Sequence, residues 1–218
     1  MMIAVEKLTV SYGDEAALQG VSLQVERGDS CAVIGASGCG KTTLLYALSG
    51  LVRPLSGTIR IDGDPLTAVR SRTSLILQDY GLLPWKSVRH NLLFPLRSRG
   101  LNKQESQKRT DRVLSDLGIL DQADKFPGAL SGGQRQRVAI GRALVLEPDL
   151  LLMDEASSAL DAVTRENIQN LVLGICLEQA LTLVLVTHSI EEAVFLGRKI
   201  VVMGRGCIRH TVDNPCYG

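Results

Sequence analysis

The stretch with the clearest chemical potential runs Gly35-Ala36-Ser37-Gly38-Cys39-Gly40-Lys41-Thr42-Thr43. Its glycines allow the backbone to curl so that several N–H groups point inward at one anion. Lys41 would reach the outer phosphates of a nucleotide, and the Thr42 hydroxyl would hold a magnesium ion. We therefore expect this loop to bind a nucleotide. The alternative is a glycine-rich turn that happens to precede an ordinary helix.

The residues on either side of this loop predict the strand and the helix that must hold it. Residues 31–34 are all apolar and indicate a short buried strand, whereas residues 44–48 indicate the first turns of a helix. A strand, a glycine loop and a helix in this order form a phosphate-binding loop, and the positive end of the helix adds to its field. By average residue usage, the spacing G-x-x-x-x-G-K-[ST] occurs by chance in roughly one chain in a hundred of this length.

Two adjacent carboxylates, Asp154 and Glu155, follow the apolar run 150–153. Such a run predicts an interior strand, and the ends of these strands form the crevice where α/β sheets bind ligands. Because consecutive strand residues point in opposite directions, the two acids should have different roles. Asp154 would bind magnesium, and Glu155 would polarise an attacking water. The alternative is an acidic pair that only caps the next helix.

A second possible anion site lies at Ser131-Gly132-Gly133-Gln134. Ser131 is a favourable residue to begin a helix, and two glycines behind it leave bare N–H groups at that helix terminus. Taken alone, Ser-Gly-Gly is also a plain linker. The helical pattern that follows, at 134–144, favours the anion site.

Elsewhere, predicted strands alternate with predicted helices, which implies a largely parallel sheet covered on both faces. Strand signals are missing from about 79 to 130, where two helical patterns suggest a small inserted helical lobe. The expected strands are 3–11, 21–25, 30–34, 58–63, 74–77, 150–154, 181–186, 199–203 and 207–209, and the expected helices are 88–96, 104–117, 133–146, 162–177 and 190–196.

Composition excludes several classes of protein. The chain has 218 residues, of which 45% are hydrophobic and 22% charged, with a net charge of +1. This charge gives no reason to expect nucleic acid or an anionic membrane as a partner, and the scarcity of aromatics argues against base stacking. The five cysteines form no C-x-x-C pair and are expected to be reduced thiols. No signal peptide and no apolar run of about 20 residues is apparent, so we expect a cytoplasmic protein.

Taken together, these motifs resemble an ATP-binding cassette (ABC) ATPase, and the resemblance runs from about Ile3 to Met203. Residues 35–43 match the Walker A motif, 130–134 the signature motif, and 150–155 the Walker B strand. One departure is visible: Ala156 and Ser157 stand where many importer cassettes have Pro-Phe, a change that removes no catalytic group.

The resemblance also assigns weaker positions. Gln78 lies where the family's Q-loop glutamine binds magnesium, His188 matches the switch histidine, and Tyr12 matches the aromatic residue that stacks on adenine. Ser158-Ala159-Leu160-Asp161 matches the D-loop. Each has a structural alternative: Tyr12 as strand-end packing, Gln78 as a polar strand terminus, and His188 as a structural histidine.

The implied fold is α/β: a P-loop NTPase core with a largely parallel sheet, an N-terminal antiparallel β subdomain and an inserted helical subdomain. We expect one domain over 1–218, with core residues 1–78 and 131–218 and helical residues 79–130. Two cassettes would dimerise head to tail around two ATP, with Mg²⁺ as cofactor. The expected catalytic residues are Glu155 and His188, the magnesium ligands Thr42, Gln78 and Asp154, and the nucleotide-binding residues Tyr12, Gly35, Ala36, Ser37, Gly38, Cys39, Gly40, Lys41, Thr42, Thr43, Gln78, Ser131, Gly132, Gly133, Gln134 and Asp161.

The segment Leu82-Leu83-Pro84-Trp85 bears on which transporter this chain serves. Its apolar residues could form a groove for a helix of a membrane partner, or Trp85 could simply fill the helical lobe. The segment is similar to cassettes of nitrate, sulfonate and taurine importers. That similarity implies permease subunits and a periplasmic or extracellular solute-binding protein as partners, no nucleic acid, and attachment to the inner membrane face through the permease. An exporter or lipoprotein-release cassette is the alternative.

Other nucleotide-binding classes fit less well. A GTPase would need an Asn-Lys-x-Asp base reader, and the near match at 102–105 ends in Glu within a polar stretch. A chromosome-maintenance or DNA-repair ATPase would need a long coiled-coil insertion, which this sequence does not contain. A translation-associated cassette protein would carry two cassettes in one chain, whereas this sequence contains one.

Overall fold

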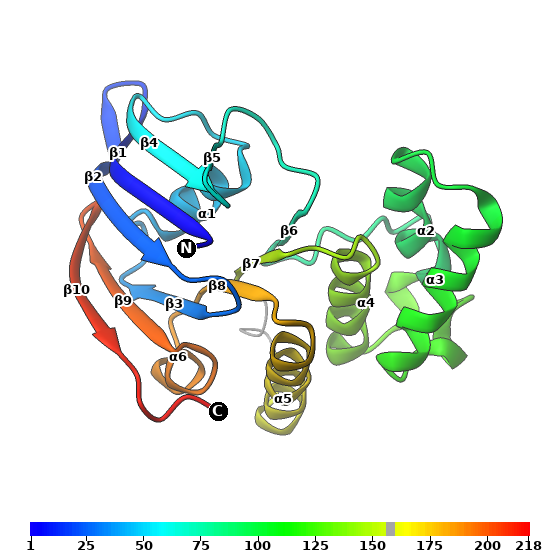
Figure 1. Ribbon diagram of the computed structural model, residues 1–218. Coiled ribbons are helices and arrows are strands. Elements are labelled where there is room, and N and C mark those ends of the chain that lie inside the picture. The colour runs from blue at the N-terminus through cyan, green and yellow to red at the C-terminus, as the bar shows by residue number, and fades with distance from the viewer. Residues whose placement is uncertain (156–159) are drawn as a thin grey trace. The chain divides into compact units, whose positions relative to one another are not determined.

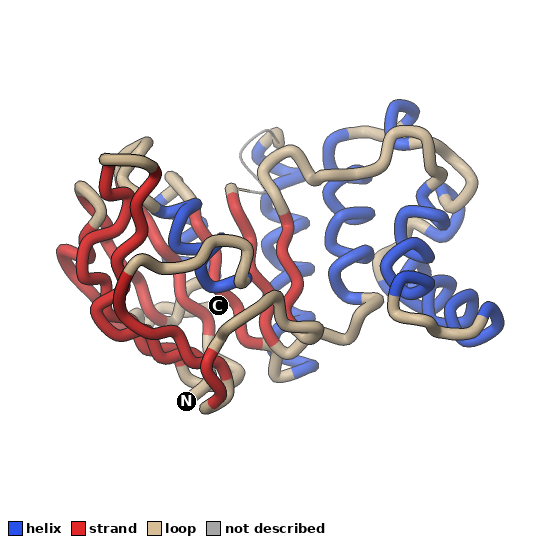
Figure 2. Tube along the Cα trace, turned by 90° about the horizontal axis from the view of Figure 1, so that it is seen from above, coloured by secondary structure: helices blue, strands red, loops and turns tan. Residues whose placement is uncertain are grey.

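The computed structural model describes residues 1–155 and 160–218. These residues divide into two compact units. The first consists of Met1–Leu75, Asp149–Glu155 and Gln169–Gly218, and the second of Ile76–Pro148 with the described residues of 156–168. Strands dominate the first unit and helices the second, as the red and blue tubes in Figure 2 show.

A four-stranded antiparallel sheet lies in the first unit, with strand order β2-β1-β4-β5. The turn between β4 and β5 consists of Asp62 and Gly63, both in the left-handed region with φ of 57° and 86°, as tight two-residue hairpins require. This sheet confirms the antiparallel β part of the predicted fold. Its strands are β1 (Ile3–Tyr12), β2 (Glu15–Val25), β4 (Ser56–Ile61) and β5 (Asp64–Pro65).

The second sheet has six strands in the order β10-β9-β3-β8-β7-β6, and the four from β9 to β7 are mutually parallel. Figure 1 shows β10, β9 and β3 side by side in this sheet. The largely parallel sheet was predicted, and its only antiparallel neighbour among the described pairings is β10 on β9. The strands are β3 (Ser30–Gly35), β6 (Thr73–Ile76), β7 (Leu150–Asp154), β8 (Thr182–Val186), β9 (Lys199–Gly204) and β10 (Cys207–Asp213).

Every residue of β7 and of β8 is buried, which explains why both strands are nearly continuous apolar runs, apart from Asp154 and Thr182, rather than alternating ones. Because β3, β7 and β8 run parallel, their carboxyl ends lie at one edge of the sheet. Helix α1 (Lys41–Ser49) packs on β7 and β8, and α6 (Ile190–Leu196) packs on β3. Helix α5 (Ala162–Gln179) joins the second unit to the first. The parallel strands thus deliver the ends of β3, β7 and β8 to one place.

Two strands extend several residues beyond the bounds that the sequence predicted. Strand β2 begins at Glu15 rather than Val21, because its pairing with β1 continues through three register shifts up to the hairpin turn. Strand β10 extends to Asp213 rather than Arg209, because its polar residues pair with β9. In both cases the extra length comes from pairing with a neighbouring strand and not from an alternating pattern.

The helical unit contains α2 (Val88–Ser98), α3 (Lys103–Asp116) and α4 (Gly132–Leu144), with short 3₁₀ turns at Leu120–Gln122 and Pro127–Ala129. Leu92, Leu96, Leu114 and Val138 are fully buried between these helices. Helix α4 approaches α2 and α3 closely at Gly141, where an added Cβ would lie 2.9 Å from Leu117 and 3.2 Å from Leu92. The helical character expected for this part of the chain is therefore present.

The loop before α2 is held by one buried amide. Asn91 accepts a hydrogen bond from the Leu83 N–H at 2.9 Å and donates to the carbonyls of Leu83, Lys86 and Ser87. Trp85, within this loop, is 69% exposed. The suggestion that Trp85 fills the helical lobe is therefore wrong, because the Asn91 amide fixes the loop and leaves the indole outside.

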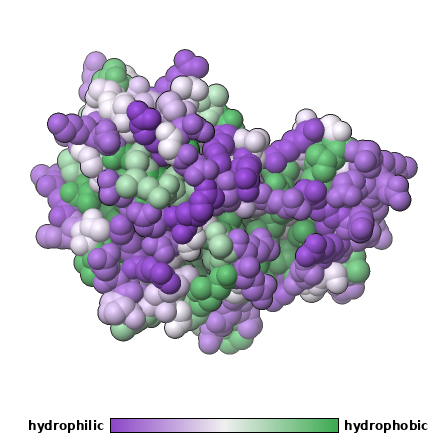
Figure 3. Space-filling model, viewed as in Figure 1, coloured by the Kyte–Doolittle hydropathy of each residue, from purple (hydrophilic) through white to green (hydrophobic). Residues whose placement is uncertain are grey.

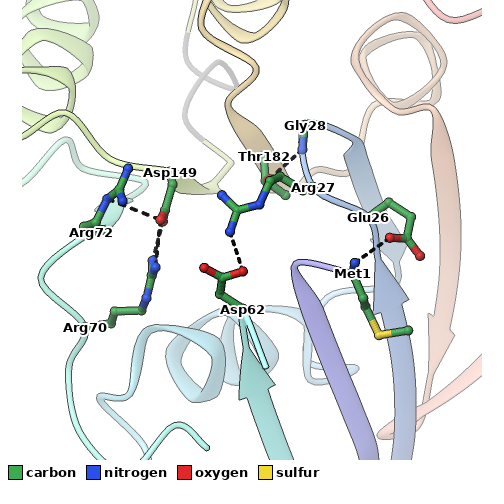
Figure 4. Close-up of polar contacts among 9 residues, drawn as sticks. All are labelled: Met1, Glu26, Arg27, Gly28, Asp62, Arg70, Arg72, Asp149 and Thr182. Carbon is green, nitrogen blue, oxygen red and sulfur yellow. Dashed lines mark hydrogen bonds and ion pairs between the residues drawn. The ribbon is translucent and has the colours of Figure 1, made fainter. Parts of the chain in front are cut away.

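A buried carboxylate secures the start of β7. Asp149 is 8% exposed and pairs with the Arg70 guanidinium through two hydrogen bonds, with Arg72 at 3.3 Å (Figure 4). The hydrogen bond to Asp149 raises the pKa of Arg70 above its ordinary value. The Asp149 N–H also donates to the Arg72 carbonyl. These contacts attach the loop before β6 to the amino end of β7.

We expect Asp149→Asn to lower the free energy of unfolding by about 1–3 kcal/mol, because it leaves partly buried guanidinium charge without its carboxylate. Urea denaturation measures this change. Asp62→Asn is the matched control, because the Arg27–Asp62 pair is exposed and should contribute little. Equal losses in the two variants would contradict a special role for the buried carboxylate.

On the face shown in Figure 3, polar residues predominate and apolar side chains appear in separate groups. Within the described ranges, 1–155 and 160–218, no helix has the length and apolarity needed to cross a membrane.

Candidate active site

The loop between β3 and α1 needs glycine at two positions. A Cβ on Gly35 would lie 2.4 Å from the Met203 carbonyl and 2.8 Å from the Cys39 sulfur, and one on Gly40 would lie 2.5 Å from the Ala17 carbonyl. Gly40 also has a φ of 104° and directly precedes α1. Backbone from β2 and β9 therefore touches the loop, and only glycine leaves room for it.

A third backbone contact supports the loop from the β9–β10 turn. The Gly206 N–H donates to the Cys39 carbonyl at 3.0 Å, and the Gly206 carbonyl accepts from the Gln19 N–H at 2.8 Å. The thiol of Cys39 is buried. The curled shape predicted from the glycines thus depends on contacts with two other segments, β2 and the β9–β10 hairpin.

Lys41 lies inside this loop. It is 6% exposed, and its Nζ donates to the carbonyls of Gly35 at 2.9 Å and Ala36 at 3.1 Å. The first N–H groups of α1 have no partner within the helix, and their dipoles favour an anion at the same place as the ammonium group. The strand, loop and helix therefore provide what a polyphosphate requires: a buried positive charge beside the backbone donors of a helix start.

Thr42 and Asp154, which are 112 positions apart, meet at the edge of the sheet. The Thr42 hydroxyl donates to Asp154 Oδ1 at 3.2 Å. Burial raises the pKa of Asp154, and the charge of Glu155 raises it further, whereas the Thr42 hydrogen bond and Lys41 oppose the shift. A hydroxyl and a carboxylate oxygen side by side fit Mg²⁺, which binds one or two protein oxygens together with phosphate and water. When bound there, the ion would neutralise charge on the phosphates.

Glu155 and His188 form the next contact, with Glu155 Oε2 lying 3.4 Å from His188 Nδ1. Glu155 has a φ of 44°, in the left-handed region, and its N–H donates to the Val186 carbonyl. Residues other than glycine rarely adopt this backbone conformation, and a residue that does so often lies at a functional position. The left-handed turn sends the Glu155 carboxylate toward His188, while Asp154 faces Thr42. These contacts are consistent with different roles for Asp154 and Glu155, as strand geometry led us to expect.

Tyr12, at the end of β1, is 54% exposed. This exposure leaves part of the ring accessible for stacking on a base, and the predicted contact of Tyr12 with adenine stays a prediction.

The helical unit carries the other predicted positions. Ser131 and Gln134 form a reciprocal capping box: the Gln134 N–H donates to Ser131 Oγ at 3.2 Å, and the Ser131 N–H donates to the Gln134 side chain at 3.0 Å. A Cβ on Gly133 would lie 2.5 Å from the Thr164 methyl, and one on Gly132 would lie 3.0 Å from Leu160. These glycines are therefore closely packed residues of a helix start and not a plain linker.

Two further positions of this unit have clear surroundings. Asp161 directly precedes α5 and accepts the Thr164 N–H at 3.0 Å, and this hydrogen bond lowers the pKa of Asp161. Gln78 is exposed just after β6. Ser158 and Ala159, assigned to the D-loop, and Ala156 and Ser157 lie outside the described residues.

The first unit thus gathers Lys41, Thr42, Asp154, Glu155 and His188 around the ends of three parallel strands. Gln78, Ser131, Gly132, Gly133, Gln134 and Asp161 belong to the second unit, where their predicted contacts with nucleotide stay predictions. Sequence reasoning did not single out Asn91, which holds the loop before α2. A buried asparagine early in a helix gives no periodic signal by which to find it.

Comparison with known proteins agrees with this geometry. The sequence profile of the family described as "ABC transporter" matches residues 18–158, and the chain belongs to that family. The ATP-binding proteins of this family are ATPases. The chain is accordingly the ATP-binding, ATP-hydrolysing subunit of an ABC transporter.

Several relatives are ATP-binding proteins of importers. The chain is 41% identical over 94% of its length to the taurine import ATP-binding protein TauB of Yersinia pestis, covering 80% of that protein. It is 42% identical over 98% of its length to the spermidine/putrescine import ATP-binding protein PotA of Pseudomonas aeruginosa, covering 60% of that protein. Among solved structures, the dimeric cassette MJ0796 bound to ADP and phosphate superimposes with a TM-score of 0.87 at 30% identity, covering 97% of this chain and 98% of that one.

Proposed function

We propose that this chain is the ATP-driven subunit of an importer, working as a homodimer that closes around two ATP and takes up a small organic sulfonate or similar anion. The observation that carries the proposal is the pair of contacts Thr42–Asp154 and Glu155–His188 beside the Lys41 loop. Together they supply a phosphate cradle, a Mg²⁺ position and a base with its histidine partner.

The chemistry assigned to each group follows from its position. Lys41 and the N–H groups at the start of α1 bind the phosphates. Glu155, whose carboxylate contacts His188, accepts a hydrogen bond from the water that attacks the terminal phosphate. His188 contacts Glu155 through Nδ1 and is 61% exposed on its side chain, so its other ring nitrogen is free to face that phosphate.

The proposed dimerisation is supported by a second helix terminus with glycine N–H groups. Ser131 and its glycines begin α4 in the helical unit, and the dimeric structure of MJ0796 supports a pair of cassettes. In such a pair, the signature residues of one chain would close over the terminal phosphate held by Lys41 of the other. Each ATP would then join two subunits, and hydrolysis would let them separate.

Attachment to a permease is supported by the loop that Asn91 holds. Trp85 is 69% exposed there, beside Leu82 and Leu83. Burial of an indole of this size on a partner is worth a few kcal/mol. The loop would receive an apolar helix of the permease and place the chain at the inner face of the membrane, with a solute-binding protein on the other side.

The sulfonate class is supported by the taurine relative, whereas the polyamine relative is the competing possibility. Deleting the gene in its source organism should abolish uptake of labelled taurine or of a short alkanesulfonate. The wild-type chain should restore uptake, and the Glu155→Gln chain should not. Nitrate and spermidine uptake are measured in parallel, and loss of spermidine uptake alone would contradict the anionic substrate.

A further inference from the structure

The helix that follows His188 satisfies only part of its C-terminal end by itself. Helix α6 has only seven residues, too few to be stable by themselves. The last carbonyl groups of a helix have no partner within it, and many helices solve this with a left-handed glycine. Gly197 follows α6 but has φ −103° and ψ 111°, which is extended backbone. The Gly197 N–H donates to the Ala193 carbonyl at 2.9 Å, so the partners for the later carbonyls must come from elsewhere.

They come from the segment after β10, residues 214–218, which we call the C-terminal segment. Asn214 donates both side-chain N–H groups, to the Val194 carbonyl at 2.7 Å and the Gly197 carbonyl at 2.8 Å. The Gly218 N–H donates to the Phe195 carbonyl at 3.3 Å. A single side-chain amide, 17 residues beyond Gly197, thus serves two of the carbonyls at the end of α6.

The C-terminal segment is itself attached to the residues that directly precede β9 and β3. The Asn214 N–H donates to the Arg198 carbonyl at 2.7 Å. The Tyr217 ring lies 5.3 Å from the Arg198 guanidinium, which pairs with Asp29 at 3.2 Å, and burial raises the pKa of Tyr217. The segment is therefore a fixed support for α6.

The position of His188 depends on the two elements that flank it. On one side, the Thr187 N–H donates to the Val33 carbonyl of β3. On the other, Ser189 caps α6 by accepting the Glu192 N–H, and its own N–H donates to the Thr187 hydroxyl. The imidazole is 61% exposed and its described side-chain contact is with Glu155. The orientation of this ring therefore depends on how β8 and α6 hold the backbone on either side of it.

We propose that Asn214 is a positioning residue for ATP hydrolysis: by capping α6 from the C-terminal segment, it holds His188 in register with Glu155. This inference rests on the catalytic role proposed above for His188. Asn214 has no place in the phosphate loop and does not touch the nucleotide-binding residues, so its influence should fall on the rate and not on binding.

The test compares Asn214→Ala with Cys216→Ser, which changes an exposed side chain of the same segment. With the purified full chain, Asn214→Ala should lower kcat for ATP hydrolysis by about tenfold, the cost of a small misplacement of a catalytic group. KM and the Kd for a fluorescent ATP analogue should stay unchanged, as should both kcat and KM in Cys216→Ser. All assays are run well below the thermal midpoint of each variant.

Nuclear magnetic resonance supplies a readout independent of activity. The chain has 3 histidines, so the His188 ring signal is assigned by its disappearance in His188→Ala. In Asn214→Ala this signal should shift or broaden, while that of His90 in α2 stays in place. An unmoved His188 signal or an unchanged kcat would overturn the proposal.

A double variant separates this proposal from the one it rests on. If Asn214 acts through His188, adding Asn214→Ala to His188→Ala should leave the residual rate unchanged within about twofold. A further tenfold fall would show a general structural effect and overturn the positioning role alone. Full activity of His188→Ala would instead remove the catalytic role of His188 and the positioning role with it.

Discussion

Glu155→Gln is expected to lower the rate of ATP hydrolysis by about 10²- to 10⁴-fold, because the variant loses the carboxylate that activates water. ATP should still bind, because glutamine has nearly the same size and shape as glutamate. The Lys41 loop and the Thr42–Asp154 pair do not depend on that charge. With ATP and Mg²⁺ present, the variant should therefore accumulate as a dimer. Phosphate release measures hydrolysis, and size-exclusion chromatography measures the oligomeric state.

Glu178→Gln is the matched control, since it makes the same chemical change at an exposed position near the end of α5. This control should hydrolyse ATP normally and should not accumulate as a dimer. A Glu155→Gln chain that stays monomeric with ATP and Mg²⁺ would refute the sandwich arrangement. Undiminished hydrolysis by the same chain would refute Glu155 as the base.

Lys41→Ala is expected to abolish detectable nucleotide binding at micromolar concentrations. The variant removes the buried ammonium group that now rests on the Gly35 and Ala36 carbonyls. Charge-assisted hydrogen bonds contribute about 1.5–3 kcal/mol each, so losing those to two phosphates weakens binding by about 100-fold or more. Isothermal titration calorimetry with ATP and Mg²⁺ measures the affinity.

Lys108→Ala serves as the control for Lys41→Ala, because it removes one positive charge from an exposed position in α3. Thermal unfolding of both variants establishes that each is folded. Tight ATP binding by a folded Lys41→Ala chain would overturn the role assigned to the loop.

The fold could be predicted from the sequence wherever a segment carries its own periodic signal. Strand Leu150–Asp154 and helix Ile190–Leu196 have the bounds that their patterns predicted. Strands β2 and β10 were predicted too short, because their extra residues are held by pairing with β1 and β9. A polar residue in such a strand looks like a loop residue until its neighbour is known.

The site was predictable to a similar extent. Lys41, Thr42, Asp154, Glu155 and His188 were expected to act together, and the structure gathers them. The separation of Asp154 from Glu155 followed from strand alternation, but the positive φ at Glu155 did not. That conformation arises where the chain leaves β7 with its N–H bonded to β8, which is a contact between segments and leaves no mark in either one alone.

Residues that act through the backbone of another segment were not predictable. Asn91 and Asn214 each use a side-chain amide to satisfy carbonyls in a neighbouring element. An asparagine in a loop or early in a helix has many ordinary reasons to be there. Only the three-dimensional arrangement shows which carbonyls it serves.

The dependence of the phosphate loop on Gly206 bears on how this protein is made. The loop lies before residue 44 in the sequence. The residues that touch it, Met203 and Gly206, come much later in the sequence. Contacts between segments this far apart form late, because the intervening chain must first be ordered. On the ribosome, the segment that contains Lys41 emerges early and waits for the β9–β10 hairpin. The supported form of the loop, and any stabilisation that bound ATP adds to it, therefore becomes available only once the chain has been made as far as Gly206.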